Sequence, residues 1–287
     1  MNLQAMKSQL ILTIKSILFV ALGLICLTCA GCFQANFDLI ITSDGAVVRN
    51  WKLLGTAPFL RQIEDIKAMN EKVFPNIRVT PISEDDMLGY EFKLDYPDIE
   101  SFAKSWSEIY SAHAGENKGV SRQNGWFFDA YEFDFYFMST PANIPPEAEY
   151  FNQAAFDSVI YDATIQLPYS ADSHDADEIS ADGKLLKWNL APIAIHGGEK
   201  NLNVRFKIWH KDKLALTAAI ELLLLAATIF FFRRARAEGS ESLNKDLRFK
   251  RNVFIGLSVA LAIISVHMLV APVTFTDTDI ISLVPNP

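Results

Sequence analysis

The sequence predicts an α+β domain followed by a transmembrane helical hairpin, with a lipoprotein-type leader in front of the domain. Segment 33–210 holds many short runs of alternating polarity and two runs of helical periodicity. An apolar run ending in a cysteine precedes it, and two apolar stretches of membrane-spanning length follow it. We therefore expect a mostly antiparallel sheet with helices on one side, anchored to a membrane at both ends.

The leader covers 1–31. A charged start and an apolar run of signal-peptide length precede the string Ala30-Gly31-Cys32. A cysteine directly after Ala-Gly is typical of a bacterial lipobox, in which Cys32 is lipidated and becomes the first residue of the mature chain. Cys29 stands where such boxes usually have leucine, so an uncleaved signal anchor is the alternative. Both interpretations place 32–210 outside the cytoplasm.

Composition excludes several classes of function for this domain. No cysteine follows Cys32, which excludes disulfides, cysteine-ligated metal sites and a thiol nucleophile in the mature chain. Segment 33–210 carries 15 lysines and arginines against 27 acidic residues, a net charge of −12. Such a surface is a poor partner for nucleic acid. We expect no cofactor.

The first half of the domain is predicted to contain two strands followed by a helix, and then the same order of elements a second time. Asp44-Gly45 is a turn signal between the first two strands, and Pro58 suits the first turn of the first helix. The expected strands are 33–41, 46–54, 77–82 and 88–96, and the expected helices are 58–75 and 98–111.

The second half is mostly strand. Asn124-Gly125 predicts a type I′ turn between the strands 118–123 and 126–138. A proline-rich loop, 139–147, and a short helix, 148–156, follow, and the remaining strands are expected at 159–167, 184–190 and 202–209.

Strand 126–138 carries an aromatic stripe made of Tyr131, Phe133, Phe135 and Phe137 on one face. Ligand pockets are mostly apolar, so this stripe could line a lipid pocket. The alternative is that the four rings belong to the ordinary core.

The segment 172–182 is rich in carboxylates and contains His174. Oxygen donors at this density could hold calcium, but the spacing matches no EF-hand loop, and a charge run between strands is usually solvated. We expect no metal site. Motifs of hydrolases, dinucleotide-binding proteins, phosphate-binding loops and metalloproteases are absent, so we expect no catalytic residues and no enzyme.

Two segments, 214–232 and 253–271, are each long enough to cross the bilayer as a helix. The loop between them, 233–251, has a net charge of +4, and the tail 272–287 has acidic residues but no basic one. The positive-inside rule then places the loop in the cytoplasm and the tail outside.

Each membrane segment contains one ionisable residue, Glu221 in the first and His267 in the second. Counted from the outer ends of the two apolar runs, they lie about 10 Å and about 6 Å deep. They could form an intramembrane pair, or each could reach the outer interface by itself.

The order of these parts resembles the LppM family of bacterial membrane-anchored lipoproteins over roughly 33–232. The residues that carry the resemblance are the Asp44-Gly45 turn, Leu167-Pro168 in LPYSADS, and Trp188 in DGKLLKWNL. The family implies an envelope-facing, membrane-anchored domain for which lipid or glycolipid handling is suggested, with no agreed catalytic residues.

Two functional hypotheses follow. The first is a non-enzymatic domain on the outer face of the cytoplasmic membrane that binds a lipid or glycolipid. The second is an extracytoplasmic sensor, or an assembly subunit of an envelope complex, which acts on a membrane-protein partner through the hairpin.

Overall fold

The computed structural model describes 33–56, 60–110, 119–139, 160–237, 241–275 and residue 281. It confirms the α+β class and the pair of long apolar helices at the end of the chain. The described residues form two compact units, where the sequence predicted one domain. Unit 1 consists of the described parts of 33–102, 135–168 and 175–202, and unit 2 contains the rest.

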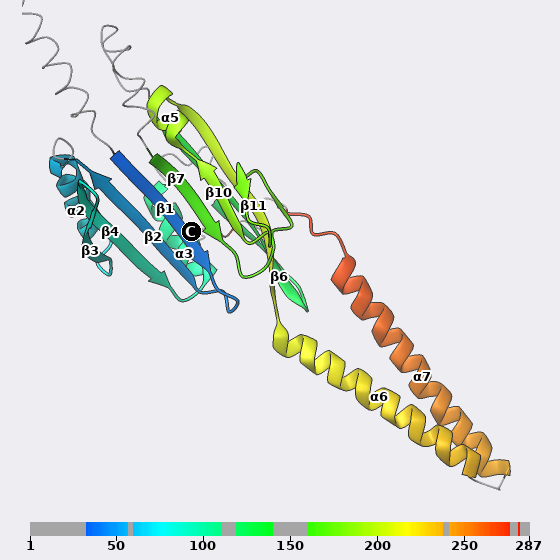
Figure 1. Ribbon diagram of the computed structural model, residues 1–287. Coiled ribbons are helices and arrows are strands. Elements are labelled where there is room, and N and C mark those ends of the chain that lie inside the picture. The colour runs from blue at the N-terminus through cyan, green and yellow to red at the C-terminus, as the bar shows by residue number, and fades with distance from the viewer. Residues whose placement is uncertain are drawn as a thin grey trace, which may run out of the picture. The chain divides into compact units, whose positions relative to one another are not determined.

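Unit 1 is built on a seven-stranded sheet in the order β3-β4-β2-β1-β7-β10-β9 (Figure 1). All neighbouring strands are antiparallel except β1 and β7, which are parallel. The strands are β1 (Phe33–Ile41), β2 (Val47–Gly55), β3 (Arg78–Glu84), β4 (Met87–Tyr96), β7 (Ile160–Gln166), β9 (Glu178–Ile179) and β10 (Leu185–Asn189).

The β1–β2 hairpin forms where the sequence predicts it. Ile41 pairs with Val47, and the chain reverses at Gly45, whose φ of 88° is easily reached only by glycine. The backbone N–H of Thr42 donates to the carbonyl of Ala46 across the turn (2.9 Å). The turn therefore fixes the register of the first two strands.

Helix α2 (Leu60–Val73) packs against β2 and β4. Ile63 on its inner face is 1% exposed, and Trp51 of β2 stacks on Phe92 of β4 with ring centroids 5.3 Å apart. Arg49 is buried beside these rings, with its guanidinium carbon 4.5 Å from the Trp51 ring centroid and 5.4 Å from that of Phe74. Helix α3 (Ile99–Tyr110) follows β4.

Strand β10 carries Trp188, one of the residues on which the family resemblance rests. Its side chain is fully buried, and its indole N–H donates to Asp175 Oδ1 (2.8 Å). Helix α5 (Ala191–His196), which the sequence did not predict, follows this strand.

A second, four-stranded sheet in the order β5-β6-β11-β8 lies largely in unit 2, and the sequence had predicted only one sheet. Its strands are β5 (Gly119–Asn124), β6 (Phe128–Ser139), β8 (Ser173–His174) and β11 (Gly198–Trp209). Val204 of β11 pairs with His174 of β8. Part of the segment expected to be a solvated loop therefore forms an edge strand.

The predicted type I′ turn at Asn124-Gly125 is wrong. Asn124 pairs with Asp129, so four residues form the loop, and Gly125 lacks the positive φ that this turn requires. The reason is apolar burial: Phe127, inside the loop, is 3% exposed, and a two-residue turn would leave no room to fold it inward. Glycine is still needed at 125, because a Cβ there would clash with the carbonyl of Phe128.

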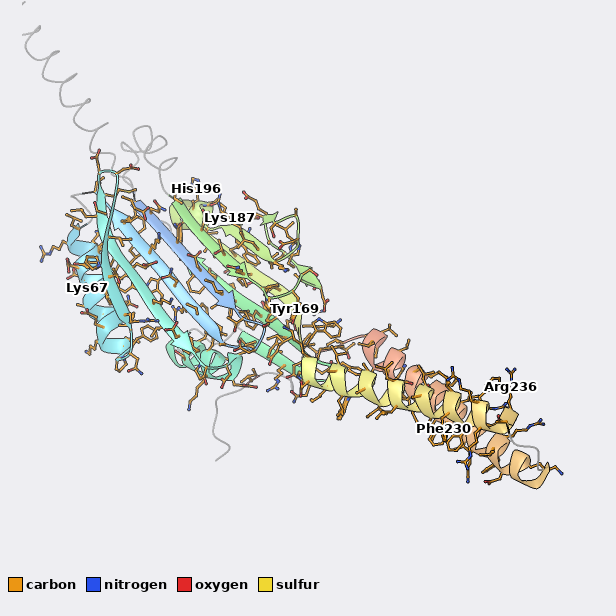
Figure 2. The ribbon with its side chains drawn as sticks, turned by 60° about the horizontal axis from the view of Figure 1, so that its bottom comes forward. Lys67, Tyr169, Lys187, His196, Phe230 and Arg236 are labelled. Carbon is orange, nitrogen blue, oxygen red and sulfur yellow. The ribbon has the colours of Figure 1, made fainter. Side chains whose placement is uncertain are left out.

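The hairpin consists of α6 (Lys211–Ala237) and α7 (Glu241–Val270). Both helices continue through most of 233–251, which was predicted as a loop, because arginine and lysine are good helix formers. Arg236 accordingly lies in the last turn of α6, at the end remote from β11 (Figure 2).

Both helices qualify as candidate membrane spans, over Lys211–Arg234 and Lys245–Val270, and neither apolar window is buried within the protein. Large apolar side chains on them are open to the surroundings, among them Leu222, Leu223, Ile263 and Val270. An apolar surface of this length needs a lipid environment or a partner to cover it.

Candidate functional site

An apolar cluster in unit 2 joins the second sheet to the helical hairpin. The buried members Phe127, Phe128 and Ala130 come from the β5–β6 loop and from β6. Leu214 near the start of α6 and Leu269 near the end of α7 pack against them, together with Trp209, Val273 and Phe275. The sheet therefore contacts the ends of both helices on the same side of the hairpin.

A polar network lies at the passage from β11 to α6, centred on His210. Its backbone N–H donates to the carbonyl of Phe127 (2.8 Å), and its Nδ1 lies 3.2 Å from the carbonyl oxygen of Trp126. Nε2 lies 3.3 Å from the buried carboxylate of Asp129, which also pairs with Arg122 Nη2 (2.6 Å). These bonds fix the direction in which the chain leaves the sheet.

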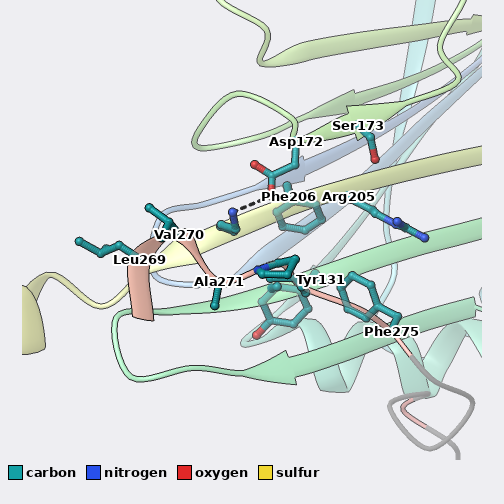
Figure 3. Close-up of a pocket in the computed structure, with 13 residues that line it drawn as sticks. Tyr131, Asp172, Ser173, Arg205, Phe206, Leu269, Val270, Ala271 and Phe275 are labelled. Carbon is teal, nitrogen blue, oxygen red and sulfur yellow. Dashed lines mark ion pairs between the residues drawn. The ribbon is translucent and has the colours of Figure 1, made fainter. Parts of the chain in front are cut away.

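Next to this cluster lies a cavity of about 410 Å³, which we call the interface cavity (Figure 3). Its walls come from β6, from β8 and the residue before it, from β11, and from the segment where α7 ends. The lining residues are Ala130, Tyr131, Asp172, Ser173, Arg205, Phe206, Lys207, Leu269, Val270, Ala271, Pro272, Val273 and Phe275.

Charged side chains line one part of the interface cavity. Lys207 Nζ lies 3.2 Å from Asp172 Oδ2, the ion pair drawn in Figure 3. Arg205 donates from Nη2 and Nε to Glu132 Oε1, at 2.6 and 2.7 Å. Both cations therefore have a carboxylate partner.

Apolar side chains line another part of the cavity, among them Leu269 and Val273. The stacked rings of Tyr131 and Phe206, with centroids 5.5 Å apart, are 6% and 1% exposed, so these two residues offer the cavity little side-chain surface. The Phe275 ring lies 5.6 Å from the guanidinium carbon of Arg205. The cavity can therefore receive a molecule that has both charged and apolar parts.

The segment after α7 is held along the edge strand β5. Gln123 Nε2 donates to the carbonyl of Thr274 (3.5 Å), and the backbone N–H of Ile281 donates to the carbonyl of Val120 (2.8 Å). This attachment keeps the wall formed by 269–275 beside the sheet.

The predicted aromatic stripe has the expected alternation, but its four rings have different surroundings. Tyr131 lines the interface cavity, whereas Phe133 and Phe135 are fully buried. The Phe137 ring contacts that of Phe37 at 6.4 Å. A lipid pocket along the whole stripe therefore stays a prediction, with Tyr131 as the member placed at a described cavity.

The predicted pairing of Glu221 with His267 does not match the observed helix register. Ser258 Oγ donates to Glu221 Oε2 (2.7 Å), and Glu221 Oε1 is buried without a hydrogen-bond partner. His267 lies nine residues further along α7, a rise of about 14 Å. The prediction assumed that the outer ends of the two apolar runs are level, and the register instead brings Glu221 beside Ser258.

Several carboxylates of 172–182 form bonds within the protein. Asp175 accepts the indole N–H of Trp188, and Asp177 pairs with Lys200 Nζ (2.8 Å). The hydrogen bond from Lys200 is the main cause that holds the pKa of Asp177 below its usual value. Within the described ranges, no group of three or more histidine, cysteine or acidic side chains could hold a metal ion.

The sequence did not indicate Arg205 or Lys207 as site residues, and it indicated Asp172 only as part of the carboxylate-rich segment 172–182. The alternation of β11 indicated that Arg205 and Lys207 lie outward, where cations are usually solvated. The predicted lipidation site, Cys32, and the leader 1–31 lie outside the described residues.

Comparison with known proteins identifies no family. No family model matches the chain, and no curated protein matches it either. A solved structure that is similar is the NMR structure of the folded domain of LppM from Mycobacterium tuberculosis, with a TM-score of 0.38 and 12% identity. The match covers 63% of this chain and 93% of that one. A likeness of this size assigns neither a family nor a ligand to the chain.

Proposed function

We propose that this protein is a non-enzymatic, membrane-anchored lipoprotein whose main domain binds a lipid or glycolipid at the outer face of the bacterial cytoplasmic membrane. The observation that carries the proposal is the interface cavity, because Leu269 and Val270 at the end of a candidate membrane span form part of its wall. A lipid could reach this wall without leaving the bilayer surface.

The connection between sheet and membrane supports this position. β11 ends at Trp209 and α6 begins at Lys211, so a single residue separates the sheet from the helix. Trp126 is half exposed, and Lys213 Nζ lies 5.4 Å from its ring centroid. Tryptophan and lysine side chains are the usual anchors at a membrane interface.

Lipid binding can be tested by filling the interface cavity. Ser173 is exposed and lines the cavity, so Ser173→Trp should occupy the space without disturbing the core. We expect native mass spectrometry of the full chain, released from membranes in mild detergent, to show a retained lipid on the wild type and not on this variant. Ser83→Trp on the exposed strand β3 is the matched control and should retain the lipid. Equal retention by both variants would exclude the cavity as the binding site.

The orientation rests on the basic residues of 233–251 and on the tail 272–287, which has no lysine or arginine. A reporter fused after Glu238 should be cytoplasmic, and one fused after Pro287 should be extracytoplasmic. A cytoplasmic C-terminus would contradict the hairpin topology.

Lipidation of Cys32 is tested separately by metabolic labelling with palmitate. Wild-type protein should become labelled, and Cys32→Ser should not. The variant should stay in the membrane through α6 and α7. If the wild type is never labelled, the signal-anchor alternative takes the place of the lipoprotein assignment.

A second candidate function, an extracytoplasmic sensor or assembly subunit, is favoured by the polar contact between Glu221 and Ser258 within the candidate spans. Ionisable groups inside a membrane are costly and commonly functional. In-cell crosslinking should then recover a membrane-protein partner with wild-type chain and lose it with Glu221→Gln. Recovery that does not change would remove the support for this candidate.

A further inference from the structure

The charges in and next to the interface cavity are balanced. Arg205 and Lys207 supply two positive charges, and Asp172 and Glu132 supply two negative ones. A ligand with a net charge would disturb this balance, whereas a ligand carrying one charge of each sign would preserve it.

The two cations keep donors for such a ligand. A guanidinium has five N–H groups, and Arg205 uses those of Nε and Nη2 on Glu132. An ammonium has three N–H groups, and Lys207 forms its ion pair with one acceptor, Asp172. Phosphate oxygens are good acceptors for both side chains.

Asp172 supplies the complementary acceptor. A carboxylate has about four acceptor sites, and the contact with Lys207 involves Oδ2. The Asp172 side chain is 46% exposed, so a primary ammonium can approach it. Asp172 and Lys207 lie only 3.2 Å apart, so a ligand that places an ammonium at Asp172 and a phosphate at Lys207 needs a short linker between the two groups.

We infer that the interface cavity selects a zwitterionic phospholipid headgroup, a phosphate ester joined to a primary ammonium as in phosphatidylethanolamine. Arg205 and Lys207 bind the phosphate, Asp172 binds the ammonium, and the glycerol end lies against Leu269 and Val273 at the end of α7. The cavity volume of about 410 Å³ lies within the range of ligand pockets. This inference rests on the proposed function, which requires a lipid in this cavity but leaves its headgroup open.

The test uses the full chain in nanodiscs made of equal parts phosphatidylethanolamine and phosphatidylglycerol. Retained lipid is identified by native mass spectrometry after transfer into detergent. Wild-type protein should retain phosphatidylethanolamine in preference to phosphatidylglycerol. Asp172→Asn should lower the ratio of the two lipids roughly tenfold, the size expected for one charge-assisted hydrogen bond.

Two variants serve as comparisons. Lys207→Gln should lower the retention of both lipids, because both carry a phosphate. Asp85→Asn makes the same charge change as Asp172→Asn in the exposed β3–β4 turn, outside unit 2, and asparagine tolerates its φ of 52°. It should leave the lipid ratio unchanged, and thermal unfolding checks that each variant is folded.

The outcomes separate this inference from the proposed function. Phosphatidylglycerol retained as well as phosphatidylethanolamine, or equal effects of Asp172→Asn and Asp85→Asn, would overturn the headgroup assignment and leave lipid binding intact. No retained lipid on the wild type would overturn the proposed function itself. Soluble phosphoethanolamine should compete only weakly. If soluble phosphoethanolamine displaced the retained lipid at the same concentration as added phosphatidylethanolamine, the cavity would bind the free zwitterion, and the lipid assignment would be overturned.

Discussion

The contact between Glu221 and Ser258 offers a direct test of the hairpin register. Glu221 lies ten residues after Lys211, a rise of about 15 Å, and Ser258 lies twelve residues before Val270, about 18 Å. Both side chains are thus near the middle of their candidate spans, where water cannot replace a lost hydrogen bond.

The size of the effect follows from this position. Interhelical hydrogen bonds in membrane proteins contribute about 0.6 kcal/mol on average and up to about 1.7 kcal/mol. Ser258 donates to one oxygen of Glu221, and the other oxygen is buried without a partner, so the bond between the two side chains should lie in the upper part of this range. We expect a coupling of about 1 kcal/mol between Glu221→Gln and Ser258→Ala, roughly fivefold in the unfolding equilibrium.

The coupling is measured with a double-mutant cycle on the full chain in detergent, using reversible unfolding followed by tryptophan fluorescence. His267→Ala is the control, because its residue lies about 14 Å further along α7 and should be additive with Glu221→Gln within about 0.5 kcal/mol. Additivity for Ser258 together with coupling for His267 would refute the observed register and favour a pair of Glu221 with His267.

Further predictions concern unit 1. Gly89→Ala should destabilise the sheet by about 1–3 kcal/mol or more, because the added Cβ would overlap the carbonyl oxygen of Leu53 on the neighbouring strand. The control is Gly256→Ala, which has open space around it and should not destabilise α7. Chemical denaturation measures the free energy of unfolding of both variants. Trp188→Ala should cost about 3–5 kcal/mol in the same assay, because the indole is fully buried; a loss below about 1 kcal/mol would contradict this packing. The pKa of Asp177 is lowered chiefly by the hydrogen bond from Lys200, so ionised Asp177 stabilises the fold above the usual carboxyl pKa, and this stabilisation is lost as pH falls through the folded-state pKa. Asp177→Asn should therefore reduce the loss of stability that the protein shows below about pH 4. The same loss of stability at low pH in this variant and the wild type would contradict the prediction.

The elements of the chain were largely predictable because their signals are local. Alternating polarity and the Asp44-Gly45 turn identified the β1–β2 hairpin to within one residue. The apolar runs located both long helices, although not their full lengths, because hydropathy detects the membrane segment and not the helical residues beyond it. The turn at Asn124-Gly125 failed because burial of Phe127 outweighed the local turn preference.

The interface cavity could not be predicted from local signals. Its charged residues Arg205 and Lys207 flank the buried Phe206 on one strand. Because side chains alternate between the two faces of a strand, the sequence pattern assigns both cations to the solvent face. Two segments that are distant in sequence cover part of β11: β8 pairs with it, and the segment after α7 returns along the sheet. Because these parts are far apart in sequence, no pattern within a single segment could predict the cavity.

The origin of the cavity walls has a thermodynamic consequence for α7. One wall belongs to the sheet, through Ala130 and Lys207, and another belongs to the end of α7, through Leu269 and the residues that follow it. A ligand held between them binds more tightly when the end of α7 is near the sheet, and by linkage it must favour that position of α7 to the same degree. The lipid-binding and sensor hypotheses are therefore compatible, because the same occupied cavity that holds a lipid would also bias the position of a membrane helix.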